Sequence, residues 1–203
     1  MKGFFKRDLY LMLVGAKFYL AFILVLGVLL FINKTAMSFV SLYVMIFLAS
    51  TLLSLFNYDE QNGWGAYAAA VPDGRRAQVD GRYLVALVVT LAAVALQGMV
   101  CLLSGGEGWE MVLLYAGMLL VYIALLFPLA YRFGNKSRLI MIILIAVVAG
   151  AIGVGGSIGI MAGGPGAKAP SFTAVGAVLL AIGAVAVVVS HRVSVAIVKR
   201  LEW

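Results

Sequence analysis

The chain has 203 residues, of which 65% are hydrophobic and only 11% are charged, and its formal net charge is +7. Soluble domains average about 45–50% apolar and roughly 25% charged residues, so this composition excludes an ordinary soluble core and indicates a protein that lies in lipid. The basic residues stand between hydrophobic runs, where membrane topology and anionic headgroups explain them better than nucleic acid does.

The first predicted element is an amphipathic helix over residues 2–16 that lies in the membrane interface and bends near Gly15 into the first span. Its apolar face is formed by Phe5, Leu9, Met12, Leu13 and Ala16. Its charged side chains fall mainly off that face: Lys2, Lys6, Arg7 and Asp8. The alternative is that these residues simply continue the first span.

Six segments are close to the roughly 20 apolar residues that a membrane helix needs. They are residues 17–32, 35–56, 83–103, 109–131, 139–161 and 172–190. The connections 33–34, 104–108 and 162–171 are short and leave no room for a large external domain. We therefore predict an all-α membrane protein in which residues 1–203 form one transmembrane domain.

Basic residues alternate between the two sets of loops. One set and the termini carry twelve of them: Lys2, Lys6, Arg7, Arg75, Arg76, Arg82, Arg132, Lys136, Arg138, Arg192, Lys199 and Arg200. The other set carries only Lys34 and Lys168. Because Lys and Arg accumulate in cytoplasmic loops, both termini and the loop 57–82 are expected in the cytoplasm.

The loop 57–82 is the longest polar interruption of the chain. Asn57 and Glu60 have the spacing of a capping box, which would place Asp59 and Glu60 in the first turn of a helix. The apolar face of that helix would contain Trp64, Tyr67, Ala68 and Val71. Pro72 would end it, Asp73 and Gly74 would form a turn, and residues 75–82 would begin a second helix. Such a helix either rests on lipid or inserts into a groove of a partner protein.

Glycines recur in the fifth predicted span, where Gly155, Gly159 and Gly163 are four residues apart. Small residues let membrane helices approach closely, so this face serves either packing within the bundle or dimerisation. Cys101, the only cysteine, is expected to be a small apolar core residue.

The motifs of enzymes are absent from the sequence. It has no P-loop, no HExxH or GxSxG motif, and no paired His or Cys that would bind a metal. We expect no catalytic residue, no metal and no cofactor on this chain, and we read the only histidine, His191, as an interfacial residue. The spans also lack central ionisable residues, which ion-coupled carriers usually retain, so energy for any transport would enter from outside the bilayer.

Two stretches have residue patterns similar to those of a known family. The first pattern is carried by Phe56, Asp59, Glu60, Gly63, Trp64, Tyr67, Pro72, Arg75, Val79, Arg82 and Tyr83. The second stretch is 127-FPLAYRFGNKSR-138. With these the chain resembles the ABC-2 type permease family, and most of all the small six-span permeases of bacterial exporters, such as those for antimicrobial or phenol-soluble-modulin peptides. It departs from many relatives at Asp73 and Gly74, where a small or hydroxyl residue usually precedes the Arg.

The resemblance implies a transmembrane subunit of the bacterial cytoplasmic membrane that forms a homodimer or a heterodimer with a paralogue. Two copies of a separate ATP-binding subunit would carry ATP and Mg²⁺, and the loop between spans two and three would hold a coupling helix seated on that subunit. The implied docking residues are Asp59, Glu60, Gly63, Trp64, Tyr67, Val71, Pro72, Arg75, Arg76 and Arg82. Arg75, Arg76 and Arg82 would meet lipid phosphates or acidic groups of the ATPase.

The leading hypothesis is thus an exporter permease whose substrate is amphipathic or hydrophobic, with a peptide as one candidate, because the available lining is apolar and uncharged. The alternative is a non-transporting membrane protein, such as an immunity or sensor-associated subunit, with no ATPase partner. A membrane enzyme is disfavoured because the sequence lacks catalytic residues.

Overall fold

The computed structural model describes residues 3–14, 50–103, 109–137, 140 and 172–200. The regular structure of these residues is helical, which confirms the predicted fold class for this part of the chain. Two helices cover residues 3–14 and 50–61. The others are α3 (Trp64–Ala70), α4 (Gly74–Leu103), α5 (Trp109–Phe133), the 3-10 helix η2 (Gly134–Lys136) and α7 (Phe172–Arg200).

Three of the described helices are long and apolar enough to cross a membrane: Gly74–Met99, Trp109–Phe133 and Thr173–Arg200. They correspond to the predicted spans 83–103, 109–131 and 172–190. Two of them extend well past the predicted limits, since α4 already begins at Gly74 and α7 continues to Arg200. A 25-residue helix is about 38 Å long at 1.5 Å per residue, more than the roughly 30 Å hydrocarbon layer.

The other predicted spans are not tested by the described helices. Residues 17–32 and 139–161 lie almost wholly outside the described part of the chain, as does most of 35–56. The bend near Gly15 and the glycines of the fifth predicted span also lie outside it.

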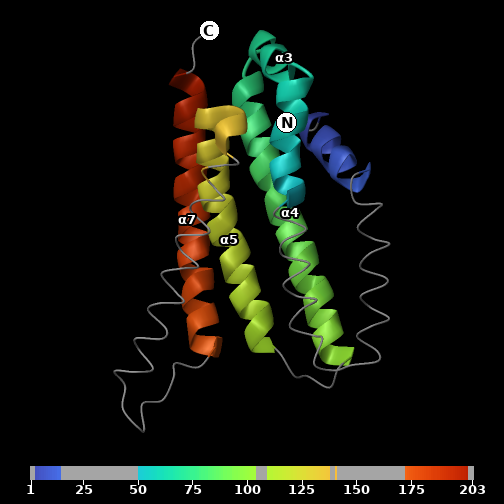
Figure 1. Cartoon of the computed structure of the whole chain (residues 1–203), viewed down its shortest axis with the longest axis vertical. Helices are drawn as coiled ribbons and strands as arrows, with labels where there is room; N and C mark the ends of the chain where they lie inside the picture. The colour runs from blue at the N-terminus through green and yellow to red at the C-terminus, as the bar shows by residue number, and fades with distance from the viewer. Residues whose placement is uncertain (1–2, 15–49, 104–108, 138–139, 141–171, 201–203) are drawn as a thin grey trace.

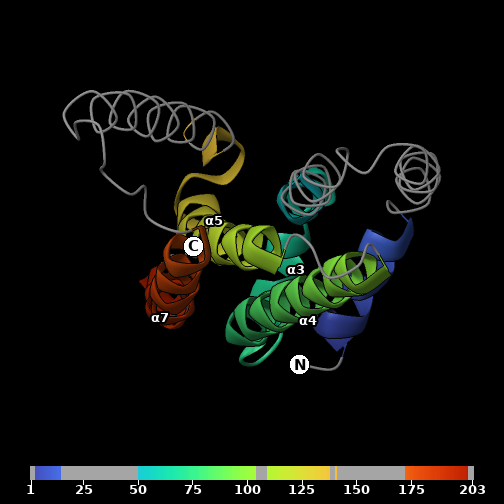
Figure 2. The ribbon, with the colours of Figure 1, turned by 90° about the horizontal axis from the view of Figure 1, so that it is seen from below.

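The long helices lie side by side, with α5 next to α7, α4 contacting both, and helix 3–14 on the opposite side of the bundle from α7 (Figures 1 and 2). The core contains Leu52 and Leu55 of helix 50–61, Val85 of α4, and Leu126 and Phe127 of α5, each at most 1% exposed. Elsewhere the spans leave large apolar side chains more than 60% exposed: Leu91, Met99, Leu102, Val185 and Val188. A wide apolar exterior of this kind is suited to contact with lipid.

Glycines allow α5 and α7 to pack with their backbones close together. A Cβ atom added at Gly117 of α5 would lie 2.8 Å from the Cβ atom of Leu179, and one at Gly183 of α7 would lie 2.8 Å from that of Leu120. Neither position has room for a side chain. This is the close approach that small residues permit in membrane helices, and in α7 it serves packing inside the bundle.

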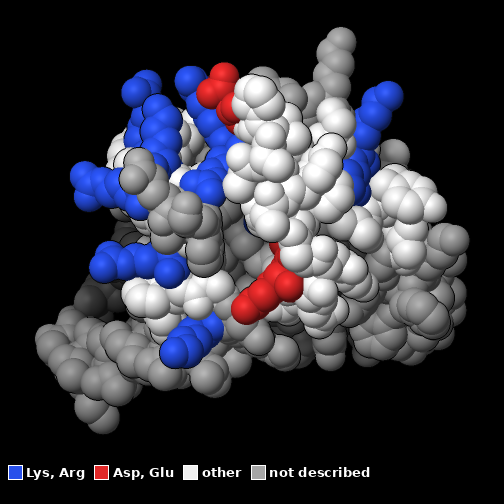
Figure 3. Space-filling model, turned by 90° about the horizontal axis from the view of Figure 1, so that it is seen from above, with Lys and Arg blue, Asp and Glu red and all other residues white. Residues whose placement is uncertain are grey.

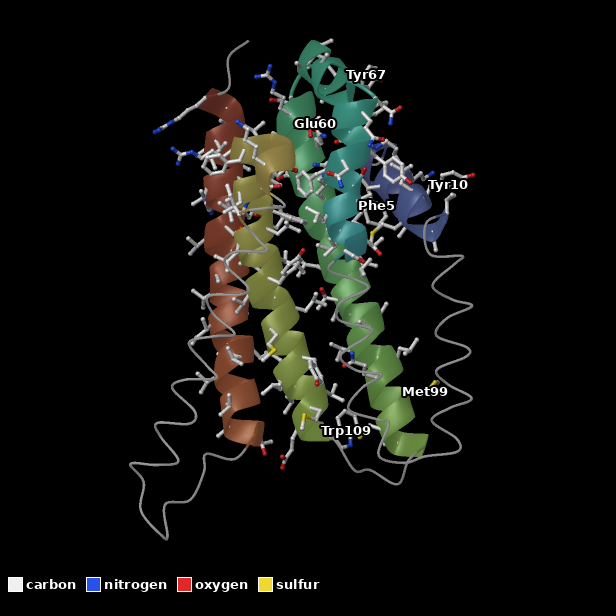
Figure 4. All side chains as sticks on the ribbon, in the orientation of Figure 1. Phe5, Tyr10, Glu60, Tyr67, Met99 and Trp109 are labelled. Atoms are coloured by element: carbon white, nitrogen blue, oxygen red, sulfur yellow. The ribbon has the colours of Figure 1, made fainter. Side chains whose placement is uncertain are left out.

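Charged residues gather at one end of the bundle, which we call the polar end. Helix 3–14, α3, the start of α4 and the ends of α5 and α7 meet there (Figure 1). Glu60 and Tyr67 lie at this end, whereas Met99 and Trp109 lie at the opposite one (Figure 4). Most charged side chains of the described structure therefore lie at the polar end.

Candidate functional site at the polar end

The polar loop does not begin its helix where the capping box predicted. Helix 50–61 runs through Asn57, Asp59 and Glu60, so these residues lie in its last turns rather than at a new N-terminus. The helix ends at Gln61, and Gly63, directly before α3, has a φ of 62°, the left-handed conformation that glycine adopts readily. The prediction was wrong because the segment is held on both sides of Asn57: Leu52 and Leu55 pack in the core before it, and after it Asp59 is bound to α4.

The rest of the loop follows the prediction. The short helix α3 spans Trp64–Ala70, and Val71 is extended, with φ −95° and ψ 134°, as expected before a proline. Asp73 has a positive φ of 54° and completes the turn. At Gly74, where α4 begins, any Cβ atom would collide with the carbonyl oxygen of Ala68. The turn is therefore compact, and only glycine fits its last position.

The predicted apolar face of α3 divides into an inner and an outer part. Ala68 is 1% exposed, and Trp64 is half-buried with its indole Nε1 fully covered. Trp64 packs edge-on against the ring of Phe4, at 6.3 Å between centroids. By contrast, Tyr67 is 54% exposed and Val71 is 37% exposed. Trp64 thus holds α3 to helix 3–14, while Tyr67 and Val71 are available to a partner.

Four charged side chains from three segments form a buried group, which we call the ion cluster: Arg7, Asp8, Asp59 and Arg82. The side chains are 19%, 0%, 12% and 2% exposed, in that order. Arg82 pairs with Asp59, and its Nε lies 3.6 Å from Oδ2 of Asp8. Arg7 pairs with Asp59 at 2.8 Å and donates from Nε to Asp8 at 2.9 Å. Two positive and two negative charges therefore neutralise one another.

The ion cluster corrects two sequence-based predictions. Asp8 was expected to fall off the buried face of its helix, yet it is fully buried. Arg82 was expected to meet lipid phosphates or a partner, yet its guanidinium lies inside the chain. Both corrections have one cause, since a buried charge requires an opposite charge beside it. The partners lie far apart in the sequence, where local periodicity carries no signal.

The environment of Asp59 makes its charge depend on the arginines. Burial raises the pKa of the Asp59 carboxyl above its ordinary value, while the positive charges of Arg82 and Arg7 act to lower it. Gln78 also donates a hydrogen bond of 2.6 Å from Nε2 to Oδ2 of Asp59. Loss of either arginine would therefore raise the pKa of the Asp59 carboxyl further.

Aromatic rings surround the ion cluster on the α5 side. The Cζ atom of Arg82 lies 4.1 Å from the ring centroid of Phe56. Phe56 in turn packs edge-on against Phe127 and Tyr131, at 5.5 Å and 5.3 Å between centroids, and Tyr83 contacts Phe127 at 4.7 Å. The two stretches that carry the family resemblance, 56–83 and 127–138, thus pack directly against each other.

A second polar group joins α4 to α7. The hydroxyl of Tyr83 lies 2.6 Å from Oγ of Ser190 and 2.9 Å from Oγ of Ser194. One turn earlier on α4, Asp80 pairs with Nε2 of His191 at 2.7 Å. This group was not predicted from the sequence, although Ser190 and Ser194 are four residues apart and so share a helix face.

The remaining predicted docking residues lie nearer the surface. Glu60, Gly63 and Pro72 are exposed, and Arg75 is half-buried. Arg76 is 63% exposed and has only a loose contact of 3.8 Å with Asp80.

Exposed basic residues also mark the ends of α5, η2 and α7: Arg132, Lys136, Arg192, Lys199 and Arg200. Seen from the polar end, Lys and Arg gather mainly over one side of the surface (Figure 3). Within the described ranges, no group of three or more His, Cys, Asp or Glu is placed to bind a metal.

Long apolar helices, with their charged groups collected at one end, define a multi-pass helical membrane protein. The family model for ABC-2 family transporter proteins matches residues 3–199, so the chain belongs to this family. The family consists of membrane permeases that have no catalytic activity of their own, and membership implies an ATPase partner. No curated protein and no solved structure matches the chain.

Proposed function

We propose that this chain is the transmembrane subunit of an ATP-binding cassette exporter, and that α3 is the helix through which a separate ATPase drives it. The observation that carries the proposal is the exposure of Tyr67 on α3 and of Val71 directly after it, while Trp64 anchors α3 to the membrane domain. A helix that inserts into a groove needs such an apolar outer face and a firm base.

The distribution of charge supports an orientation with the polar end in the cytoplasm. Exposed Lys and Arg cluster there, on α4, α5, η2 and α7, as the positive-inside rule requires for cytoplasmic ends. In that orientation both termini and α3 face the compartment that holds ATP. We place the protein in the bacterial cytoplasmic membrane on this ground and on its family.

The proposed assembly contains two permease copies, identical or paralogous, and two ATPase subunits that bind ATP and Mg²⁺. Tyr67 on α3, and Val71 and Pro72 directly after it, would contact the ATPase. Exposed Arg76 would pair with an acidic group of the ATPase or with a lipid phosphate. Arg82 and Trp64 would not contact the ATPase, and they would hold the docking helix in place against the membrane domain.

The proposed substrate is amphipathic or hydrophobic, and peptides are one class of candidates. The described spans present Leu, Val, Phe, Tyr and Met, whereas their charged residues stay at the polar end or at the very start of α5, where Glu110 lies. A route lined in this way carries no fixed charge and favours cargo with a large apolar surface.

Co-purification tests this function. The chain would be tagged and co-expressed with the ATPase encoded beside it, and the bound ATPase and its rate of ATP hydrolysis would be measured. We expect the wild-type chain to retain the ATPase, and Tyr67→Ala combined with Val71→Asp to lose at least about tenfold of it, equivalent to roughly 1.4 kcal/mol.

The matched control is Leu91→Ala, which also removes an exposed apolar side chain but lies within the span, at 69% exposure. It should bind the ATPase as the wild type does. If the wild-type chain retains no ATPase, or if the α3 variant retains as much as the control, the proposal is wrong.

A further inference from the structure

We propose that helix 3–14, α3 and the first turns of α4 move as one rigid body, and that the ion cluster with Arg82 at its centre holds that body together. The inference rests on the proposed function, because it assigns the route by which movement of α3 is transmitted to the membrane domain. Arg82 is a positioning residue in this scheme, and it does not touch the ATPase.

The first support is the closed arrangement of the ion cluster. Each arginine contacts both carboxylates, since Arg82 pairs with Asp8 and Asp59 and Arg7 pairs with the same two residues. Asp8 and Arg7 belong to helix 3–14, Asp59 lies in the last turn of helix 50–61, and Arg82 belongs to α4. Removing any one member leaves an uncompensated charge in a buried site, so the segments hold their places together or separate together.

The second support is close packing of helix 3–14 on α4. A Cβ atom added at Gly81 would lie 3.5 Å from the Cβ atom of Phe4 and 3.5 Å from the backbone nitrogen of Phe5. The backbone of helix 3–14 therefore rests directly over Gly81, one residue before Arg82. Met12, 6% exposed, belongs to the apolar core that also contains Val79 and Tyr83 of α4.

The third support is the attachment of α3. It has seven residues, too few for a helix to be stable alone, so its position depends on what it packs against. Trp64 lies against Phe4, and the Cζ atom of Arg7 lies 4.3 Å from the Trp64 ring centroid. α3 cannot tilt without displacing the side chains of helix 3–14 that complete the ion cluster.

A disulfide tests whether helix 3–14 and α4 are one body, and it needs no ATPase. In a Cys101→Ala background, which has no other cysteine, Phe4→Cys and Gly81→Cys place two Cβ atoms at a separation that suits a disulfide. We expect mild oxidation of membranes to crosslink most of the protein. Adding Arg82→Gln should lower the crosslinking rate at least about fivefold, and adding Asp59→Asn as well should restore part of it by removing one charge of each sign.

The matched control for the crosslinking test is Arg76→Gln, which removes an exposed arginine six residues earlier on α4. It should leave the crosslinking rate within about twofold of that of the protein that carries only the Phe4→Cys, Gly81→Cys and Cys101→Ala changes. If Arg82→Gln crosslinks as fast as this control, the ion cluster does not hold helix 3–14, and the proposal is overturned whether or not an ATPase partner exists.

A second arm tests transmission in the complex with the ATPase. A single Leu13→Cys, at a position 58% exposed, reports the surroundings of helix 3–14 through its rate of labelling by a maleimide. Trapping with ATP and vanadate should change this rate at least about threefold, and Arg82→Gln should abolish the change in complex that has been purified with its ATPase bound. The 4–81 disulfide should leave ATP hydrolysis within about twofold of the reduced protein.

The outcomes separate the two proposals. If no ATPase co-purifies, the proposed function fails, and the crosslinking arm alone decides whether the ion cluster holds the helices. If the ATPase is bound but the disulfide slows ATP hydrolysis more than about threefold, helix 3–14 must move relative to α4, and the rigid body is refuted. The same holds if Arg82→Gln leaves the labelling change intact.

Discussion

The polar end and the seam between α5 and α7 hold their helices together by opposite means. At the polar end, helix 3–14 and α3 are attached to α4 through a buried set of charges and a few aromatic contacts. At the seam, glycines bring two backbones together and apolar side chains fill the remaining space. The first arrangement depends on a few directional contacts, and the second is spread over the length of two helices. A single substitution should therefore lower the free energy of unfolding by different amounts in the two regions.

The largest effect is expected at the centre of the ion cluster. Arg82→Ala leaves two carboxylates with one arginine in a buried site, and breaking a buried pair in this way costs about 3–5 kcal/mol. The control Arg76→Ala removes an exposed arginine and should cost at most about 1 kcal/mol. Unfolding of both variants in detergent micelles would measure the difference. If both variants lose the same free energy of unfolding, the buried charges contribute no more to stability than a surface pair does.

A smaller effect is expected at the seam. Gly117→Ala places a methyl group 2.8 Å from the Cβ atom of Leu179, and overpacking of this kind costs about 1–3 kcal/mol. Gly65→Ala is the control, because nothing lies within 4 Å of its added Cβ atom, and it should be neutral or stabilising. If the unfolding of Gly117→Ala in micelles matches that of the control, α5 and α7 are not in close backbone contact.

The smallest effect concerns the polar group between α4 and α7, which shares features of both regions. Tyr83→Phe removes one hydroxyl and its contacts with Ser190 and Ser194 but keeps the ring that packs on Phe127. Each of these two hydrogen bonds contributes about 0.5–1.5 kcal/mol. The exposed Tyr58→Phe is the control and should not change the free energy of unfolding. If Tyr83→Phe lowers the free energy of unfolding by much more than Gly117→Ala does, the predicted order of the two effects is wrong.

The elements that the sequence predicted well share a local cause. The three described spans follow from continuous apolar runs, and the turn at residues 71–74 follows from the restriction that Pro72 places on Val71. The capping box failed although it too is a local pattern. Asn57 carries the signal of a helix start, but packing of Leu52 and Leu55 in the core keeps helix 50–61 intact beyond it.

The candidate site was predicted only in part. The loop, its short helix and its aromatic residues were identified, but not the direction in which each side chain points. Trp64 and Tyr67 are three residues apart and were assigned one face, and their ring centroids do lie 4.7 Å apart, but only Trp64 is covered by Phe4, whereas Tyr67 is exposed. A helix of seven residues has too few turns to define a face by periodicity, so its neighbours determine which side is covered.

The sequence alone determined that this protein lies in a membrane, that charge gathers at one end of its helices, and that a short polar loop carries a helix and a tight turn. These follow from composition and from neighbours along the chain. Only the tertiary structure decided that Asp8, Asp59 and Arg82 meet. A charge enters a buried site only together with its counter-charge, and partners separated by more than twenty residues are brought together by packing, which no local pattern records.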